Sequence, residues 1–273
     1  MGLARYLRRR VLGPIGQLFC DMHVRELLAS PHYQDPRRLE PYGFRSFSQN
    51  DEDGILQEIF RRLGEDARSF VEFGVGNGLQ NNTRLLLYRG WRGLWIEADP
   101  SSCRKIRRSF ARELASGQLQ LLSELVTRDN IQALIESAKL GPIDLLSVDI
   151  DGNDYWIWEA LDLQPRVVVI EYNAKFHPPT QWVMEYDAAH EWNASDYQGA
   201  SLQSLADLSA RKGYRLAGCC LAGVNAFFVR RDLAAEHFPE EDVGYLYNPP
   251  RYYLQHFMPS GHPSGTFGAY RLQ

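Results

Sequence analysis

Two short apolar runs of the chain each end in a carboxylate, and glycines follow the first of them. The first run reads FVEFGVGNG and contains Glu72, Gly74, Gly76 and Gly78; the second reads LWIEADP and contains Glu97. Alternating glycines let a backbone turn tightly and approach a ligand closely. A carboxylate at the end of the next strand can accept two hydrogen bonds from a ribose diol. The pattern therefore predicts a site for a nucleoside.

The glycine spacing separates two classes of nucleoside ligand. A dinucleotide site has the pattern G-x-G-x-x-G, with pyrophosphate at a helix N-terminus, whereas this chain has E-x-G-x-G-x-G. The carboxylate of Glu72 would repel phosphates and attract a cation such as an amino group. S-adenosylmethionine has a ribose, a charged amino-acid end and no phosphate, and we predict it as the cofactor. A plain glycine turn between surface acids is the alternative, and the spacing disfavours a nicotinamide-dependent oxidoreductase.

A second polar set follows two later apolar runs. Asp149 and Asp151 in SVDIDGNDYW lie two residues apart, and so do Glu171 and Asn173 in VVVIEYN, so each pair points to one side of its strand. Converging carboxylates repel one another unless something neutralises them, and Mg²⁺ prefers oxygen ligands. These four residues form a predicted magnesium site. Binding of substrate hydroxyls is the alternative, and Asp154 could simply cap the following helix.

Transfer of a methyl group from such a cofactor needs few protein groups. The enzyme aligns a nucleophile with the S–CH₃ bond and removes its proton. His177 in NAKFHPP is the first candidate base and His190 the second, while Asp149 and Asp151 could act through a bound metal. An ordinary polar loop residue is the other interpretation of His177. Lys175 could pair with a carboxylate of the substrate.

The elements that must position these residues alternate along the chain. Residues 50–64 have helical apolar spacing, and from residue 69 strand patterns alternate with helix patterns, which predicts a parallel sheet with helices on both faces. The last two strands have no helix between them, so we expect them to pair antiparallel at one edge. The predicted strands cover residues 69–75, 93–99, 119–126, 143–151, 166–173, 215–223 and 225–233.

Three regions surround this alternation. Residues 1–45 are predicted to form a helical or irregular N-terminal extension, and residues 46–233 the main domain. Residues 174–199 do not fit the alternation and read as a lid insertion. Residues 234–273 read as an aromatic-rich C-terminal tail.

The motifs together resemble class I S-adenosylmethionine-dependent methyltransferases of the FkbM-like group, over roughly residues 46–233. The stretches that carry the resemblance are SFSQNDEDGIL, FVEFGVGNGLQNNT, GWRGLWIEADP, IDLLSVDIDGNDYWIWEAL, VVVIEYN and GYRLAGCCLAGVNAFFVRRDL. The resemblance implies an α/β, Rossmann-like fold with a seven-stranded, mostly parallel sheet and an antiparallel C-terminal hairpin.

The resemblance also implies roles for single residues. Glu72 and the three glycines would hold the methionine part of the cofactor, and Glu97 its ribose. Asp149 would lie near the sulfonium. Metal-dependent methyltransferases of this fold have an adjacent pair of ligands where this chain has Glu171 and Asn173 two apart. Further implied contacts are Gln49, Asp53 and Thr83 with the amino-acid end, and Glu124 or Leu125 with the adenine.

Composition excludes some functions. The 273 residues include 44% hydrophobic and 23% charged residues, with a net charge of −4, which argues against a nucleic-acid partner. The four cysteines form no CxxC pair and indicate reduced thiols in the cytoplasm. The segment before residue 13 carries Arg5, Arg8, Arg9 and Arg10 among apolar residues; it could contact an anionic membrane surface or pack on the protein.

The expected function is O-methylation of a hydroxyl on a sugar-like or natural-product acceptor, that is, a small molecule or a glycan. N-methylation and non-catalytic cofactor binding are the alternatives, and a homo-oligomer is left open. Nothing in the motifs identifies the acceptor.

Overall fold

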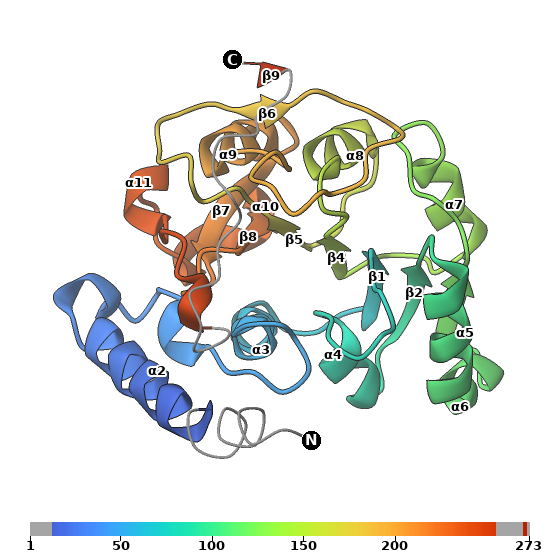
Figure 1. Ribbon diagram of the computed structural model, residues 1–273, viewed down its shortest axis with the longest axis horizontal. Helices are drawn as coiled ribbons and strands as arrows, with labels where there is room; N and C mark the ends of the chain where they lie inside the picture. Colours follow the sequence, from blue (N-terminus) through green and yellow to red (C-terminus); the bar gives the residue numbers. More distant parts are fainter. Residues whose placement is uncertain (1–12, 255–269, 272–273) are drawn as a thin grey trace, which may run out of the picture.

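A seven-stranded sheet forms the centre of the protein (Figure 1). The structure is a computed structural model that describes residues 13–254 and 270–271. The strand order is β3-β2-β1-β4-β5-β8-β7, and the first five strands run parallel while β8 pairs antiparallel with both β5 and β7. The predicted fold class is confirmed, including the antiparallel hairpin at one edge. The strands are β1 (Ser69–Phe73), β2 (Arg92–Ile96), β3 (Leu119–Leu122), β4 (Leu145–Val148), β5 (Val167–Glu171), β7 (Tyr214–Cys219) and β8 (Asn225–Arg230).

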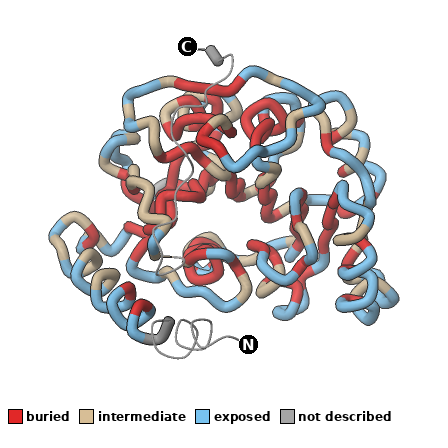
Figure 2. The backbone as a smooth tube through the Cα atoms, viewed as in Figure 1, coloured by how far each residue is buried: buried red, intermediate tan, exposed pale blue. Residues whose placement is uncertain are grey.

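Helices cover both faces of the sheet, and each face has its own apolar core. Along β1, Phe70 packs into one core and Val71 into the other, as the alternation of side chains along a strand requires. Figure 2 shows the strands as buried between the two helix layers. One face carries α3 (Glu52–Leu63), α4 (Arg84–Tyr88), α5 (Pro100–Ser109) and α6 (Ala111–Ala115), and the other carries α7 (Ile131–Ser137), α8 (Asp154–Ala160) and α9 (Leu202–Arg211).

Local sequence explains where several elements begin and end. Asp99 caps α5 by accepting hydrogen bonds from the backbone N–H groups of Ser101 and Ser102, and Pro100 occupies the first turn, where no N–H is needed. Helix α3 ends at Gly64, which has φ +72°. Strand β1 ends two residues earlier than predicted because Gly74, with φ +77°, leaves the extended conformation.

The N-terminal extension is joined to the C-terminal part of the chain. The buried guanidinium of Arg38 pairs with Glu40 and lies 5.0 Å from the ring centroids of both Tyr33 and Tyr245. Asn248 donates a hydrogen bond to Glu40. The extension contains α2 (Gly13–Leu28), η2 (Pro31–Tyr33) and η3 (Glu40–Tyr42), and the later segment contains α10 (Arg231–Ala234), η4 (Ala235–His237), α11 (Val243–Leu246) and η5 (Tyr252–Leu254).

The predicted lid insertion contains a strand that the sequence did not reveal. Strand β6 (Val183–Met184) pairs antiparallel with β9 (Tyr270–Arg271), so the insertion and the tail meet in a small second sheet. Among the helices of the described ranges, none has the length and apolarity that a bilayer crossing requires.

Candidate functional site

The glycine loop after β1 combines two tightly packed glycines with one that faces open space. A Cβ atom on Gly74 would lie 1.6 Å from the backbone oxygen of Asp149, and one on Gly78 would lie 2.9 Å from the ring of Trp95. A Cβ atom on Gly76 would meet nothing within 4 Å. All three residues have positive φ values, of 77°, 53° and 74° in chain order. Gly74 and Gly78 therefore fix the loop, and Gly76 leaves room for a ligand to approach the backbone.

Glu97 connects the glycine loop with the end of β2. Its Oε2 accepts a hydrogen bond from the backbone N–H of Gly76 (2.6 Å), and its Oε1 accepts one from the N–H of Asp99 (2.8 Å). Each carboxylate oxygen has a second lone pair. The carboxylate can therefore hold the loop and also accept hydrogen bonds from the hydroxyls of a ribose.

Glu72 lies inside the protein rather than at the open face of the loop. Its carboxylate accepts hydrogen bonds from the N–H of Asn82 (2.8 Å), from the N–H and hydroxyl of Thr83 (3.2 and 2.5 Å) and from the hydroxyl of Ser147 (3.2 Å). Burial raises the pKa of Glu72 to about 7, although these hydrogen bonds oppose the shift. Thr83 is also fully buried, and its hydroxyl accepts a hydrogen bond from Trp95. In this structure both residues hold the segment that follows the glycine loop.

The other predicted cofactor contacts are spread around the loop. Asp53 uses one carboxylate oxygen to accept hydrogen bonds from three consecutive backbone N–H groups of residues 46–48, at 2.7, 2.6 and 2.9 Å. Gln49 is exposed and lines a cavity of about 200 Å³ beside α2. Glu124 and Leu125 are exposed on the loop after β3. Within the described residues, no hydrogen bond joins any of these four residues to the glycine loop, and their contacts with a cofactor stay predictions.

Three of the four predicted metal ligands converge. Carboxylate oxygens of Asp149, Asp151 and Glu171 all lie within 4.8 Å of one another, where β4 and β5 end side by side. Burial, and then the neighbouring charge of Asp151, raises the pKa of Asp149 well above its ordinary value. Burial and then Asp149 do the same for Glu171. The cluster can therefore bind a hard cation or hydrogen-bond donors, because either would relieve the repulsion.

The neighbours of this acidic cluster set its geometry. Asp154 accepts hydrogen bonds from the N–H groups of Ile150 and Gly152, both at 2.9 Å, and so fixes the turn in which Asp151 has a φ of +55°. Asn173, the fourth predicted ligand, makes its own contacts after β5. Its amide donates hydrogen bonds to the backbone oxygens of Asp196 (2.8 Å) and Gln198 (3.2 Å) and holds the end of the insertion.

The two candidate histidines differ in their surroundings. His177 is exposed, and its ring lies 4.9 Å from that of Tyr247. His190 packs directly on the turn of the acidic cluster, since a Cβ atom on Gly152 would lie 2.4 Å from its Cδ2 and 2.9 Å from its Nε2. The Nε2 atom of His190 is buried and has no hydrogen-bond partner. The structure thus places the second candidate, not the first, against the turn that carries Asp151.

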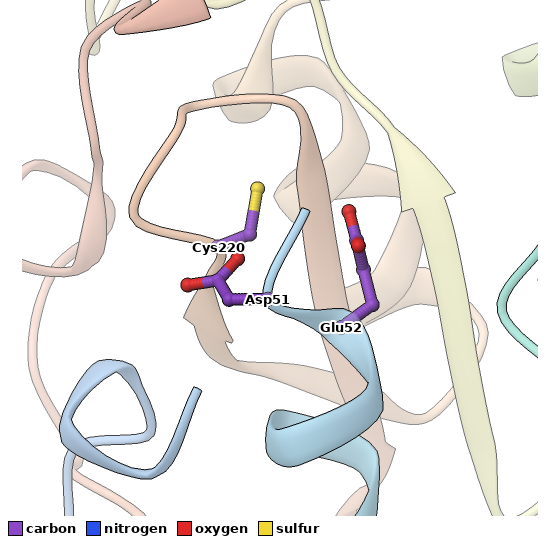
Figure 3. Close-up of side chains that lie close together, drawn as sticks. All are labelled: Asp51, Glu52 and Cys220. Carbon is purple, nitrogen blue, oxygen red and sulfur yellow. The ribbon is translucent and has the colours of Figure 1, made fainter. Parts of the chain in front are cut away.

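A further group of acids, which the sequence did not single out, joins α3 to the turn between β7 and β8. Figure 3 shows Asp51, Glu52 and Cys220, whose ligand-type atoms lie within 4.8 Å of one another. Glu52 accepts three hydrogen bonds, two from Asn50 and one from the amide of Asn225. The sulfur of Cys220 accepts two from backbone N–H groups. One carboxylate oxygen of Asp51 accepts a hydrogen bond from the backbone N–H of Leu221 (3.1 Å), while its other oxygen is buried without a hydrogen-bond partner. The hydrogen bonds of Asp51 and Glu52 connect the start of α3 with β8 and the turn that precedes it.

Comparisons with known proteins give only distant likenesses. No family model matches the chain, and no curated protein matches it. Among solved structures, the pyocyanin biosynthetic protein PhzM is 15% identical, with a TM-score of 0.38 over 63% of this chain and 53% of that one, so the match spans about half of PhzM. An S-adenosylmethionine-dependent methyltransferase from Clostridium acetobutylicum is 8% identical (TM-score 0.43; 77% and 98% of the two chains).

A third structure is CalS10, an amino pentose methyltransferase from Micromonospora echinaspora. It is 14% identical, with a TM-score of 0.43 over 67% of this chain and 92% of that one. These identities and scores assign neither a family nor an activity. The fold class rests on the strand order and direction of the sheet itself.

Proposed function

We propose that the protein is an S-adenosylmethionine-dependent methyltransferase that methylates a hydroxyl of a small-molecule or glycan acceptor. One observation carries the proposal: the open face of Gly76 lies beside the carboxylate of Glu97, at the edge where β1 and β2 end. In open α/β sheets, ligands bind outside the carboxyl ends of the strands. The loop offers close backbone approach and the carboxylate offers acceptors for a ribose diol, and both are parts of the predicted nucleoside site.

The acidic cluster supports an acceptor site next to this loop. Gly74 lies against the backbone of Asp149, so the glycine loop and the end of β4 are in direct contact. When bound, the cofactor would supply a methyl group already activated on a sulfonium. The chain would orient the acceptor hydroxyl toward that methyl group and take its proton. Asp149, Asp151 and Glu171 form the acidic cluster at this edge of the sheet.

Two routes could remove the proton. A divalent cation held by the three carboxylates would lower the pKa of a bound hydroxyl, and three converging oxygens are a donor set that suits Mg²⁺. Without a cation, His190 is the base that the structure favours over His177, because its unpartnered Nε2 lies against Gly152. N-methylation stays the alternative reaction, and it would not require the cation.

The test is incubation of the protein with methyl-labelled S-adenosylmethionine and candidate hydroxylated glycans and small molecules. We expect label in an acceptor and loss of transfer in the Asp149→Asn/Asp151→Asn variant. Addition of a chelator, followed by added Mg²⁺, separates the two routes. Methyl transfer should stop and then resume only if it depends on a bound cation. If the chain binds a nicotinamide dinucleotide and not the sulfonium cofactor, the proposal is wrong.

Gly152→Ala tests the role of His190 separately. The added methyl group would lie 2.4 Å from the imidazole and must displace it. We expect transfer to fall at least about tenfold while cofactor affinity is unchanged, if His190 is the base. The control is His177→Ala, which should transfer normally. If His177→Ala loses transfer and Gly152→Ala does not, His177 and not His190 is the base.

A further inference from the structure

Asp51 occupies the N-cap position of α3, but its side chain does not cap the helix. A capping aspartate accepts hydrogen bonds from backbone N–H groups of the first turn, whereas the side chain of Asp51 accepts none of these. One of its oxygens is bonded to the N–H of Leu221, after β7, and the other is buried without a partner. The carboxylate is therefore directed away from its own helix and toward the turn between β7 and β8.

Two further groups of the kind that bind metals lie beside this carboxylate. One carboxylate oxygen each of Asp51 and Glu52 and the sulfur of Cys220 lie within 4.8 Å of one another, and Figure 3 shows them where the start of α3 meets the turn. Glu52 and Cys220 are fully buried. Burial, and then the charge of Glu52, raises the pKa of Asp51 to about 7. A cation between the two carboxylates would relieve their repulsion.

The surroundings of the sulfur suit its charged form and hold a second unpaired oxygen. The sulfur of Cys220 accepts hydrogen bonds from the N–H groups of Val224 (3.2 Å) and Asn225 (3.1 Å). Such donors stabilise a thiolate more than a neutral thiol, whose sulfur is a weak acceptor. Asn225 is 4% exposed, and its amide nitrogen donates a hydrogen bond to Glu52 (2.8 Å), while its Oδ1 is buried without a partner. The amide of Asn225 therefore lies at this group of side chains and orients Glu52.

A cavity gives access to this group from outside. It measures about 200 Å³, lies beside α2, and has Asp51 in its lining. The described lining also contains Asp21 and the exposed Arg45, while its third acid, Glu40, is paired with Arg38. The carboxylates of Asp51 and Asp21 outweigh the guanidinium of Arg45, so the charge of the lining favours entry of a cation.

We propose that Asp51, Glu52 and Cys220 bind a Zn²⁺ ion that joins the start of α3 to the turn between β7 and β8. A sulfur beside two carboxylates suits zinc, whereas Mg²⁺ and Ca²⁺ prefer oxygen ligands alone. Ligand atoms around a tetrahedral zinc lie about 3.3–3.5 Å apart, so these atoms must approach one another by at most about 1.5 Å. Binding breaks the S–H bond of Cys220 and releases its proton to water. The proposal does not depend on the methyltransferase assignment, since these residues belong neither to the glycine loop nor to the acidic cluster.

The test is titration of the chelator-treated full chain with Co²⁺, which occupies zinc sites and absorbs light by charge transfer from a bound thiolate. We expect this absorption to appear in the parent chain and to disappear when Zn²⁺ displaces Co²⁺. Cys220→Ser should abolish the absorption. Asp51→Asn has nearly the same shape as the parent residue and keeps the thiolate, and it should weaken Co²⁺ binding at least about tenfold.

The matched control is Cys219→Ser, which changes the adjacent cysteine. Cys219 is as buried as Cys220 but belongs to the apolar core on the other face of the sheet. This variant should keep the absorption, and so should Asp149→Asn/Asp151→Asn, which removes two carboxylates of the acidic cluster. Absence of the absorption from the parent chain, its persistence in Cys220→Ser, or its loss from folded Cys219→Ser would overturn the proposal. If Cys220→Ser fails to fold, unchanged Co²⁺ affinity in Asp51→Asn would overturn it instead.

Discussion

Replacing Gly74 and Gly76 separately by alanine should have different consequences, although both glycines belong to one loop. Both have φ values in the left-handed region, which costs alanine about 1–2 kcal/mol of folding free energy. At Gly76 the new methyl group meets no atom within 4 Å, so this is the whole cost. At Gly74 the methyl carbon would lie 1.6 Å from the backbone oxygen of Asp149.

That contact must open by at least about 1.7 Å to reach an ordinary carbon–oxygen separation of about 3.3 Å. The ends of β1 and β4 would have to move apart, and overpacking of this kind adds about 1–3 kcal/mol. We therefore expect the free energy of unfolding to fall by about 2–5 kcal/mol in Gly74→Ala and by about 1–2 kcal/mol in Gly76→Ala. Urea denaturation of the two variants beside the parent chain measures both values.

Cofactor binding should show the opposite pattern. Gly76→Ala places a methyl group in the space where the ligand approaches the loop, so its affinity for S-adenosylhomocysteine should fall at least about tenfold while its fold is retained. Calorimetry on the folded variant measures this affinity. Equal stability of the two variants would refute the close approach of Gly74 to β4. Unchanged affinity in Gly76→Ala would show that the loop does not hold the cofactor.

Three further predictions concern carboxylates. Glu97→Ala should weaken binding of S-adenosylhomocysteine by about 1.5–3 kcal/mol, measured by calorimetry, because hydrogen bonds to a charged group are lost. Glu97→Gln should weaken binding less than Glu97→Ala does. Unchanged affinity in Glu97→Ala would argue against a ribose contact. The buried Glu72 has a pKa raised from an ordinary 4.5 to about 7, so the folded state holds its proton longer than the unfolded state, and its contribution to stability falls as pH rises from about 4.5 to 7. Between these pH values, the free energy of unfolding of the parent chain should fall by about 3 kcal/mol relative to that of Glu72→Gln, measured by denaturation at each pH. If the free energies of both proteins change with pH in the same way, the pKa of Glu72 is not raised. Asp149→Asn combined with Asp151→Asn should abolish methyl transfer and change cofactor affinity less than about threefold, and full activity of this variant would exclude a catalytic role for the cluster.

The sheet could be predicted because its signals are local. The β-branched run before Glu171 is typical of a strand that is covered on both faces, and it forms β5 in the structure. The glycines at 74, 76 and 78 indicated a turn, and each adopts the positive φ that favours glycine. Three acids could be expected together because neighbouring parallel strands end at the same edge of a sheet.

The parts that the sequence did not reveal depend on long-range contacts. Nothing local shows that β6 pairs with β9, which lies more than eighty residues later in the chain. The amide of Asn173 turns toward residues 196–198 because the insertion folds back over the strand ends. The packing of His190 on Gly152 has the same cause. Patterns of spacing place residues along an element, whereas these contacts depend on the path of a loop.

Binding of S-adenosylmethionine to the purified chain tests the central claim most directly. Calorimetric titration with S-adenosylhomocysteine, and in parallel with NAD⁺, asks whether the corner formed by Gly76 and Glu97 holds a nucleoside without phosphates. The account predicts one binding event per chain for S-adenosylhomocysteine, none for NAD⁺, and weaker binding in Glu97→Ala. Binding of NAD⁺ without binding of S-adenosylhomocysteine would contradict it.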